Sequence, residues 1–366
     1  MRTIHAVTTE SEDKEKYYEE DESLVDAQER YYGEAEMFSE VDKIALAVWG
    51  KTQAKNQEQR EGYIERKDFK TVFKGTLPES TQRIRKEKPN ANDKERLAYD
   101  VVLSAPKSVS MALHLEGDLR VFDAHMEAVQ ETLELIEKEL AMARIQVNGQ
   151  RQVVKTGNLI AALLPHHTSR EGDMQLHTHT LIMNGTKCPD GEWRALYHEP
   201  LVQAQWVGGF YRQKLAEKMQ ELGYRIYNTE HGFELSGYSP SDLKLFSKRN
   251  IEIVKALEAE GLSVNAQNKK DKVLTTRKAK SKTGKSLENK QEEWREEGHS
   301  HQVGQLERSH PIKIQPNQEA ATESVNSAIR HLSERSVSFN RNDIYSYVFQ
   351  HIYDGGRDFE QINRAI

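Results

Sequence analysis

The sequence has few of the features that mark secreted or membrane proteins. Its 366 residues include one cysteine, Cys188, so no disulfide can form within the chain, which favours a reducing, cytoplasmic setting. No stretch approaches the roughly 18 consecutive apolar residues of a spanning helix, and the N-terminus lacks an apolar run of signal-peptide length. Prolines number only nine. We therefore expect a globular chain of about two domains, without membrane insertion.

The net charge of −6 conceals two segments of opposite charge. Residues 9–42 carry fourteen acids against three bases, a local charge of −11 that leaves +5 for the rest of the chain. Residues 269–290 hold nine Lys or Arg against two acids. Such a basic run can follow a phosphate backbone, but taken alone it is more typical of a solvated helix or a disordered loop, so composition leaves both interpretations open.

Hydrophobic periodicity predicts an α+β fold. Apolar residues in 121–140 recur at spacings of three and four, which predicts a long amphipathic helix. Residues 99–104 alternate like a strand and lead to Pro106, which suits a first helical turn. The β-type runs at 153–164 and 176–184, joined by a polar loop, indicate an antiparallel sheet.

Two further elements are expected after this sheet. Residues 201–223 are typical of a helix that ends at Gly223, and residues 225–235 are typical of a hairpin. Because strands and helices mix without strict βαβ alternation, the predicted class is α+β.

Three histidines on two predicted strands form the most specific chemical pattern. His177 and His179 are two residues apart, so they share one face of a strand, and the connection 168–175 would bring His166 opposite them. Three imidazoles with coordination positions left open suit a catalytic divalent metal, and neutral nitrogens favour Zn, Mn, Fe, Ni or Co over Mg. His167 would point to the opposite face and is not expected to be a ligand.

Asp100 stands on another predicted strand, just before the Ser-Ala-Pro-Lys turn. A carboxylate commonly accepts the proton of the outer nitrogen of a ligand histidine, and it can also help to take up the proton of a nucleophile. A strand-end aspartate paired with a nearby lysine is the alternative.

Two tyrosine pairs, Tyr17-Tyr18 and Tyr31-Tyr32, lie in the acidic segment. Tyrosine can attack a phosphodiester when a metal polarises the phosphate and a base accepts the phenolic proton. Simple packing is the other interpretation, and the acidic neighbours disfavour the phenolate. A tyrosine mechanism would therefore depend on the metal and on a local base.

The order of these motifs resembles a known family. It is similar to the relaxase domain of conjugative relaxase-helicases of the F-plasmid type (MobF class), within the histidine-hydrophobe-histidine (HUH) endonuclease superfamily. The resemblance covers about residues 10–300. It rests on the run YDVVLSAPKSVS around Asp100, Gly117-Asp118, Ala124-His125, Thr156-Gly-Asn-Leu, HHTSR at 166–170, QLHTH at 175–179, Gly191-Glu-Trp193 and LTTRKAK at 274–280.

The resemblance implies a central five-stranded antiparallel sheet flanked by helices, the HUH relaxase fold, with a helical C-terminal extension. It implies site- and strand-specific DNA nicking and rejoining at a plasmid origin of transfer, through a 5′-phosphotyrosine intermediate. Carried over by position, Tyr17 is the nucleophile and Tyr18 its neighbour, while Tyr31 and Tyr32 are candidates for a second strand transfer. By the same resemblance, His166, His177 and His179 are the metal ligands and Asp100 supports them. The implied DNA-binding residues are Lys107, Arg170, Arg277 and Lys280.

The same resemblance implies the cofactor, the partners and the domain organisation. Mg or Mn is expected as the divalent metal in use, with Zn, Ni or Co able to occupy the site. The expected partners of this cytoplasmic monomer are single-stranded DNA at the origin of transfer, relaxosome accessory proteins and a type IV secretion coupling protein. The implied domains are a relaxase over 1–300, with DNA-covering helices at 240–300, a linker over 301–318, and at 319–366 the truncated start of a helical domain that precedes a helicase.

Three other functions fit parts of the pattern. A rolling-circle replication initiator of the same superfamily would share the tyrosine chemistry. A non-catalytic DNA-binding module would use the histidines for structural zinc, and it would be indifferent to replacement of Tyr17. A metallohydrolase would use water as the nucleophile, without a covalent intermediate.

Overall fold

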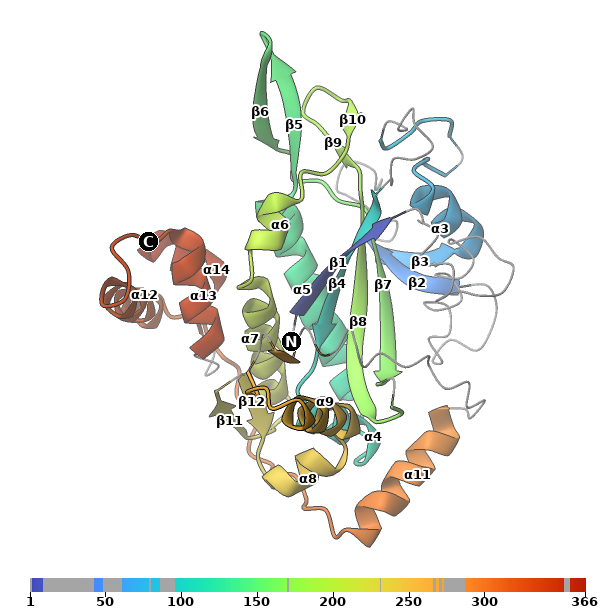
Figure 1. Cartoon of the computed structure of the whole chain (residues 1–366), viewed down its shortest axis with the longest axis vertical. Helices are drawn as coiled ribbons and strands as arrows, with labels where there is room; N and C mark the ends of the chain where they lie inside the picture. Colours follow the sequence, from blue (N-terminus) through green and yellow to red (C-terminus); the bar gives the residue numbers. More distant parts are fainter. Residues whose placement is uncertain are drawn as a thin grey trace.

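Six antiparallel strands form the central sheet in the described part of the chain, in the order β1–β4–β8–β7–β2–β3 (Figure 1). The computed structural model describes residues 2–8, 43–48, 61–78, 80–85, 96–169, 171–230, 232–265, 268–269, 272, 287–351 and 356–366. The sheet consists of β1 (Arg2–Thr8), β4 (Arg96–Ser104), β8 (Met174–Met183), β7 (Ala161–Thr168), β2 (Lys43–Val48) and β3 (Glu61–Glu65). The α+β class with an antiparallel sheet is confirmed, with one strand more than the five that the resemblance implied.

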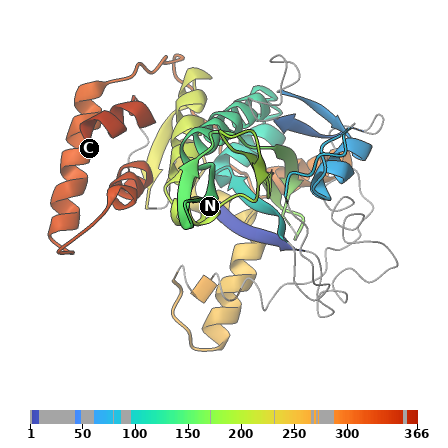
Figure 2. The same ribbon diagram turned by 90° about the horizontal axis from the view of Figure 1, so that it is seen from above.

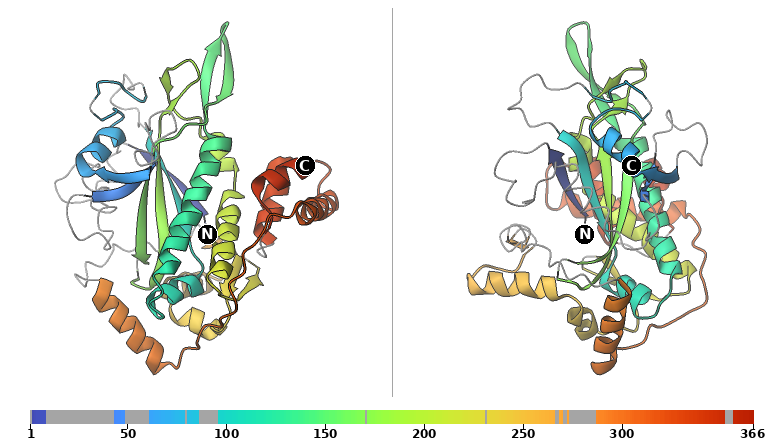
Figure 3. Two further views of the ribbon diagram at one scale, coloured as in Figure 1. Left: turned by 180° about the vertical axis from the view of Figure 1, so that it is seen from behind. Right: turned by 90° about the vertical axis from the view of Figure 1, so that its right-hand side faces the viewer.

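Helices α4 (Lys107–His114), α5 (Arg120–Leu140) and α7 (Val207–Glu221) cover one face of the sheet (Figure 3). The predicted amphipathic helix is α5, whose apolar stripe, including Val129 and Ile136, packs in the main core with Val101 of β4. Pro106 has extended dihedrals and immediately precedes α4, so the predicted strand–turn–helix is confirmed.

The opposite face of the sheet is divided between an apolar end and a polar end. At the apolar end, Val72 and Phe73 of α3 (Arg66–Phe73), together with Ile84, pack on Leu164 and Leu181 of β7 and β8. The other end of this face carries the predicted histidines.

The β-type run at 153–164 is two elements rather than one. β6 (Gln150–Lys155) pairs with β5 (Met142–Val147) in a separate hairpin, and β7 begins only at Ala161. Gly157, at a φ of +59°, turns the chain between them, so the two parts of the run belong to different sheets. Period-2 patterning could not reveal this break, because both parts are β-type.

The remaining elements follow the predicted order. Helix α7 ends before Gly223, whose φ is +84°, and the hairpin lies at 226–235, both as expected. The prediction of one continuous helix over 201–223 is wrong, because the backbone leaves helical dihedrals at Ala204, whose ψ is 64°. The first part of that run is the separate short helix α6, and α7 begins only at Val207. No helix among the described residues is long and apolar enough to cross a membrane. These elements are β9 (Thr186–Lys187), β10 (Trp193–Arg194), α6 (Glu199–Gln203), β11 (Ile226–Thr229), β12 (Gly232–Leu235), α8 (Pro240–Leu245), α9 (Lys248–Ala259), α11 (Leu287–Ser300), α12 (Gln318–Ser333), α13 (Arg341–His351) and α14 (Phe359–Ala365).

The C-terminal helices pack on α7, on its side away from the sheet (Figure 2). The indole of Trp206 contacts the rings of Tyr345 and Phe359, with centroids 5.2 and 5.4 Å away, and its Nε1 donates to Asn342 Oδ1 at 3.0 Å. Residues 301–317, which precede these helices, contain no helix or strand. The division into a relaxase and a following domain stays a prediction, but α12–α14 share a core with α7.

Gly209 permits the close approach of α13 to α7. A Cβ at this position would lie 2.4 Å from the backbone oxygen of Phe349. Glycine-to-alanine exchange inside a helix is usually stabilising by up to about 1 kcal/mol, but here the clash is expected to make Gly209→Ala destabilising by about 2 kcal/mol. Urea unfolding would measure this loss. Gly298→Ala in α11 is the control, because its nearest neighbours lie at an ordinary 3.8–3.9 Å, and equal stability of the two variants would contradict the packing.

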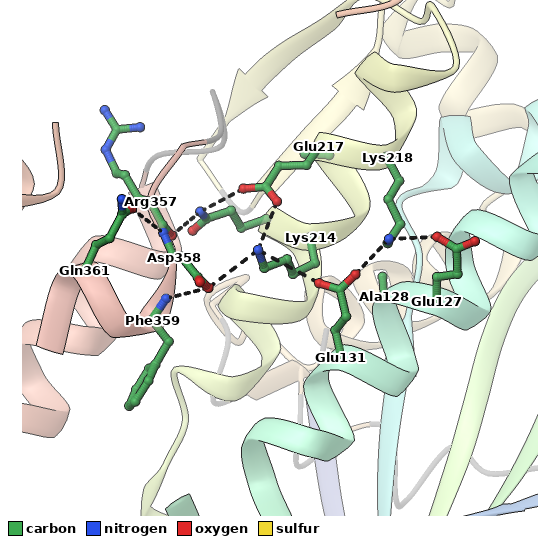
Figure 4. Close-up of polar contacts among 12 residues, drawn as sticks. Glu127, Ala128, Glu131, Lys214, Glu217, Lys218, Arg357, Asp358, Phe359 and Gln361 are labelled. Atoms are coloured by element: carbon green, nitrogen blue, oxygen red, sulfur yellow. Dashed lines mark hydrogen bonds and ion pairs between the residues drawn. The ribbon is translucent and has the colours of Figure 1, made fainter. Parts of the chain in front are cut away.

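An ion-pair cluster joins α5, α7 and the N-terminus of α14 (Figure 4). The Lys214 Nζ lies 3.1 Å from a Glu217 oxygen, 3.6 Å from Asp358 and 3.9 Å from Glu131, and Lys218 pairs with Glu131 and Glu127 at 2.8 Å each. Burial raises the pKa of Glu217, and Lys214 opposes this rise. Lys214 therefore helps to keep a largely buried carboxylate ionised.

Lys214→Met is expected to destabilise the fold by about 1–3 kcal/mol at neutral pH, because Glu217 loses its cation. When the pKa of a carboxyl is higher in the folded than in the unfolded state, the free energy of unfolding falls as the pH rises from the lower pKa to the higher one. The destabilisation caused by Lys214→Met should therefore be smaller at pH 5 than at pH 7. Urea unfolding at both pH values measures this. Lys138→Met, which breaks the exposed pair with Glu360, should cost under about 1 kcal/mol at either pH. A pH-independent loss in Lys214→Met would contradict the role of Glu217.

Candidate functional site

Three histidine rings converge on one face of the sheet, at the end that the α3 cluster leaves uncovered. His166 of β7 pairs directly with His177 of β8, and His179 follows two residues along β8 on the same face. The ring centroids lie 5.3 Å apart for His166–His177, 5.1 Å for His166–His179 and 5.3 Å for His177–His179. The structure thus brings together the three residues that the sequence pattern predicted.

Hydrogen bonds orient two of the three rings. His179 Nδ1 lies 2.7 Å from Asp100 Oδ2, and His177 Nδ1 lies 2.9 Å from the carbonyl oxygen of Gln175. A carbonyl, like an ionised carboxylate, can only accept, so Nδ1 of each neutral ring carries the proton and Nε2 keeps its lone pair. This is the tautomer that a metal-ligating imidazole needs, and Asp100 stands where a supporting carboxylate was expected.

The spacing of the rings suits one shared cation. Imidazole nitrogens about 2.1 Å from a tetrahedral ion place their ring centroids roughly 5 Å apart, as these are. In the part of the chain that the structure describes, no three His, Cys, Asp or Glu side chains have their donor atoms gathered as around a bound ion. The three rings nevertheless have the centroid separations that a shared ion requires.

Thr178, which lies between the two histidines of β8, is hydrogen-bonded to a buried histidine on the other face of the sheet. Thr178 points into the helix layer, where its Oγ1 lies 2.7 Å from His125 Nε2, and His125 Nδ1 lies 2.7 Å from the hydroxyl of Tyr211. Burial lowers the pKa of His125 to about 3, so the ring is neutral at physiological pH. Sequence reasoning assigned no role to His125, although Ala124-His125 belongs to the motifs that carried the resemblance.

His167 points away from the three-histidine face, as predicted. Its ring stacks on Phe122, and its Nδ1 lies 3.4 Å from His114 Nε2. Burial lowers the pKa of His167 to about 4 and that of His114 to about 3. Both rings therefore act as neutral packing groups behind the site.

Comparison with known proteins identifies the family of this fold and site. The profile described as "TrwC relaxase" matches residues 11–301. The chain belongs to the TrwC relaxase family. The multifunctional conjugation protein TraI of Escherichia coli K12 is 32% identical in an alignment of 308 positions that covers 78% of this chain and 17% of TraI. The chain thus spans about a sixth of the length of this curated relative.

Solved structures of TrwC share the fold of this family member. The metal-bound structure of conjugative relaxase TrwC in complex with oriT DNA is 32% identical, with a TM-score of 0.69, over 83% of this chain and 99% of the solved TrwC chain. TrwC complexed with a 27-mer DNA comprising the recognition hairpin and the cleavage site is 30% identical, with a TM-score of 0.68 and the same coverage.

The other predicted site residues of this TrwC-family chain are placed only in part. Lys107 is partly buried, and its Nζ donates to the carbonyl oxygen of Met174 at 2.5 Å. Burial lowers the pKa of Lys107 to about 8, although the charges of Asp173 and Glu234 oppose this shift. A DNA contact by Lys107 stays a prediction. The residues that lie outside the described part of the chain are Tyr17, Tyr18, Tyr31, Tyr32, Arg170, Arg277 and Lys280.

Proposed function

We propose that this relaxase cuts and rejoins one DNA strand at a plasmid origin of transfer by metal-assisted transesterification. The observation that carries the proposal is the convergence of His166, His177 and His179, with Asp100 bonded to His179, in a chain of the TrwC family. The likeness to TrwC bound to oriT DNA supports the choice of substrate. A set of neutral imidazoles with an outer carboxylate suits charge neutralisation on a phosphodiester.

Each proposed residue has a distinct task. His166, His177 and His179 would hold the metal, whose positive charge, when bound, stabilises the developing charge on the scissile phosphate. Asp100 is bonded to Nδ1 of His179, so the lone pair on Nε2 points away from the carboxylate and is available to a metal. The phenolic oxygen of Tyr17 attacks the phosphorus while its proton passes, through a local base or solvent, to the departing 3′ oxygen. The bond to the 3′ oxygen then breaks, leaving a 3′-hydroxyl and a 5′-phosphotyrosine, and the reverse reaction rejoins the strand.

The finer assignments belong to the same proposal. Mg or Mn is the proposed metal in use, with Zn, Ni or Co able to replace it. Tyr18 is the neighbour of the proposed nucleophile, and Tyr31 and Tyr32 are proposed to serve a second strand transfer. Arg170, Arg277, Lys280 and Lys107 are the proposed DNA-binding residues, and helices at 240–300 are proposed to cover the DNA. The protein is proposed to be a cytoplasmic monomer, and its proposed partners are single-stranded DNA, relaxosome accessory proteins and a type IV secretion coupling protein.

Incubation with oligonucleotides tests the proposal. The purified chain is mixed with single strands that span candidate origins of transfer, with and without Mg²⁺ or Mn²⁺, and is resolved on a denaturing gel. We expect a metal-dependent protein band shifted by covalently attached DNA. Cleavage without a shifted band would indicate water as the nucleophile, and the absence of cleavage on every candidate origin would contradict the proposal. A shifted band only with replication origins would favour a rolling-circle initiator.

A further inference from the structure

The turn that joins the two histidine strands is closed by its own hydrogen bonds. The Ser169 amide donates to the Asp173 carbonyl at 2.8 Å, and the Gly172 amide donates to the Ser169 carbonyl at 3.0 Å. The Asp173 amide also donates to Ser169 Oγ at 3.1 Å. These bonds fix the shape of the turn, but they do not fasten it to the rest of the protein.

Asp173 ties this turn to helix α9. The Asp173 side chain is 2% exposed, and its Oδ2 accepts the backbone N–H of Lys248, the first residue of α9, at 2.6 Å. The N-cap residue of α9, Ser247, makes no capping bond with its own side chain, so a residue 75 positions away supplies the cap. A carboxylate at a helix N-terminus is stabilised by the helix dipole. The Lys248 ammonium, 3.8 Å from Asp173 Oδ1, adds a second charge contact.

Trp294 ties the same turn to helix α11. Its indole Nε1 donates to the Gly172 carbonyl at 3.0 Å, and the side chain is 4% exposed. The ring packs in an apolar cluster with Met111 of α4 and with Met174, the first residue of β8. Helices α9 and α11 thus hold one turn from two directions, close to the site (Figure 1).

The pair formed by His166 and His177 lies next to this turn. Regular pairing of β7 with β8 runs from Ala161–Ile182 to His166–His177, and the register then shifts before Thr168–Met174. The last regular pair is therefore the histidine pair, and an irregular step separates it from the turn. Because the histidine pair is the regular pair nearest to this irregular step, the shape of the turn bears directly on how His166 and His177 face each other.

We propose that Asp173 and Trp294 are positioning residues that set the geometry of the three-histidine site by fastening the β7–β8 turn to α9 and α11. The inference rests on the proposed function, in which these histidines hold a metal. In this proposal, the helical region after residue 240 has a second function besides covering the DNA, because it also determines how tightly the metal is bound.

Cobalt binding to the purified chain tests the inference. Co²⁺ is titrated into the wild type, Asp173→Asn and Trp294→Phe, and the affinity and visible absorption are recorded. Asparagine keeps an oxygen acceptor but loses the charge, whereas phenylalanine keeps a ring in the pocket but loses the N–H donor. We expect Asp173→Asn to weaken Co²⁺ binding about 5- to 10-fold and Trp294→Phe about 2- to 3-fold, each with altered band intensities. Glu171→Gln removes a charge from an exposed position of the same turn and should bind as the wild type does.

The outcomes separate the two proposals. Wild-type affinity and an unchanged spectrum in both variants would overturn the positioning role while leaving the metal site intact. A wild type that binds no Co²⁺, or that binds it no better than His177→Ala, would overturn the proposed metal site and the positioning role with it. Circular dichroism establishes that each variant is folded. Should Asp173→Asn not fold, Trp294→Phe decides the question, because it preserves the packing of the apolar cluster.

Discussion

Replacement of Tyr17 by phenylalanine is expected to abolish the covalent protein–DNA adduct. Phenylalanine keeps the ring and removes only the hydroxyl oxygen that would attack the phosphorus, so the chain can still fold and bind metal. Loss of a covalent nucleophile typically costs on the order of 10⁴-fold or more in rate, which places the residual adduct below detection on a denaturing gel. The measurement is adduct formation over time with a single-stranded oligonucleotide of the origin of transfer and Mg²⁺ or Mn²⁺.

Tyr18→Phe is the matched control for this experiment, because it removes the same hydroxyl from the neighbouring position. We expect Tyr18→Phe to retain most of the first cleavage, and the same holds for Tyr31→Phe and Tyr32→Phe if the second pair serves a later strand transfer. An undiminished adduct in Tyr17→Phe would reject this nucleophile. Loss of the adduct only in Tyr18→Phe would move the role by one residue.

Local periodicity was sufficient to predict the elements that carry the site. The spacing of two between His177 and His179 required them to share a face, and the short connection to β7 placed His166 opposite them, as the strand register confirms. The stripe along residues 121–140 predicted α5 for the same reason. These features depend on neighbours within one strand, one hairpin or one helix.

Features that depend on distant segments could not be predicted in this way. The carboxylate of Asp173 caps a helix 75 residues away, and nothing near either position in the sequence signals that contact. Phe349 packs on Gly209 although the two residues are 140 positions apart, so the sequence around this helical glycine did not indicate the contact. Periodicity also could not divide the run at 153–164, because hydrophobic alternation is the same in a hairpin and in the central sheet.

The three-histidine site leads to the second large expected effect. His177→Ala should remove one of three ligands and abolish tight binding of a divalent metal, so that adduct formation falls at least about 100-fold at micromolar metal. The two remaining imidazoles, His166 and His179, would lie 5.1 Å apart by their centroids and cannot by themselves restore a three-ligand site. Isothermal titration with Mn²⁺ measures the affinity, and the denaturing gel measures the reaction.

Asp100→Asn is expected to reduce metal affinity less than His177→Ala does, because it leaves all three ligands in place. Asn can present its amide oxygen to Nδ1 of His179, but the negative charge that favours the Nδ1–H tautomer is lost. We expect a drop in metal affinity of about 10-fold, with excess Mn²⁺ restoring much of the adduct in Asp100→Asn and little of it in His177→Ala. Equal metal affinity in His177→Ala and the wild type would exclude this cluster as the metal site. Failure of excess metal to restore Asp100→Asn would instead assign Asp100 to proton transfer from the tyrosine rather than to the support of His179.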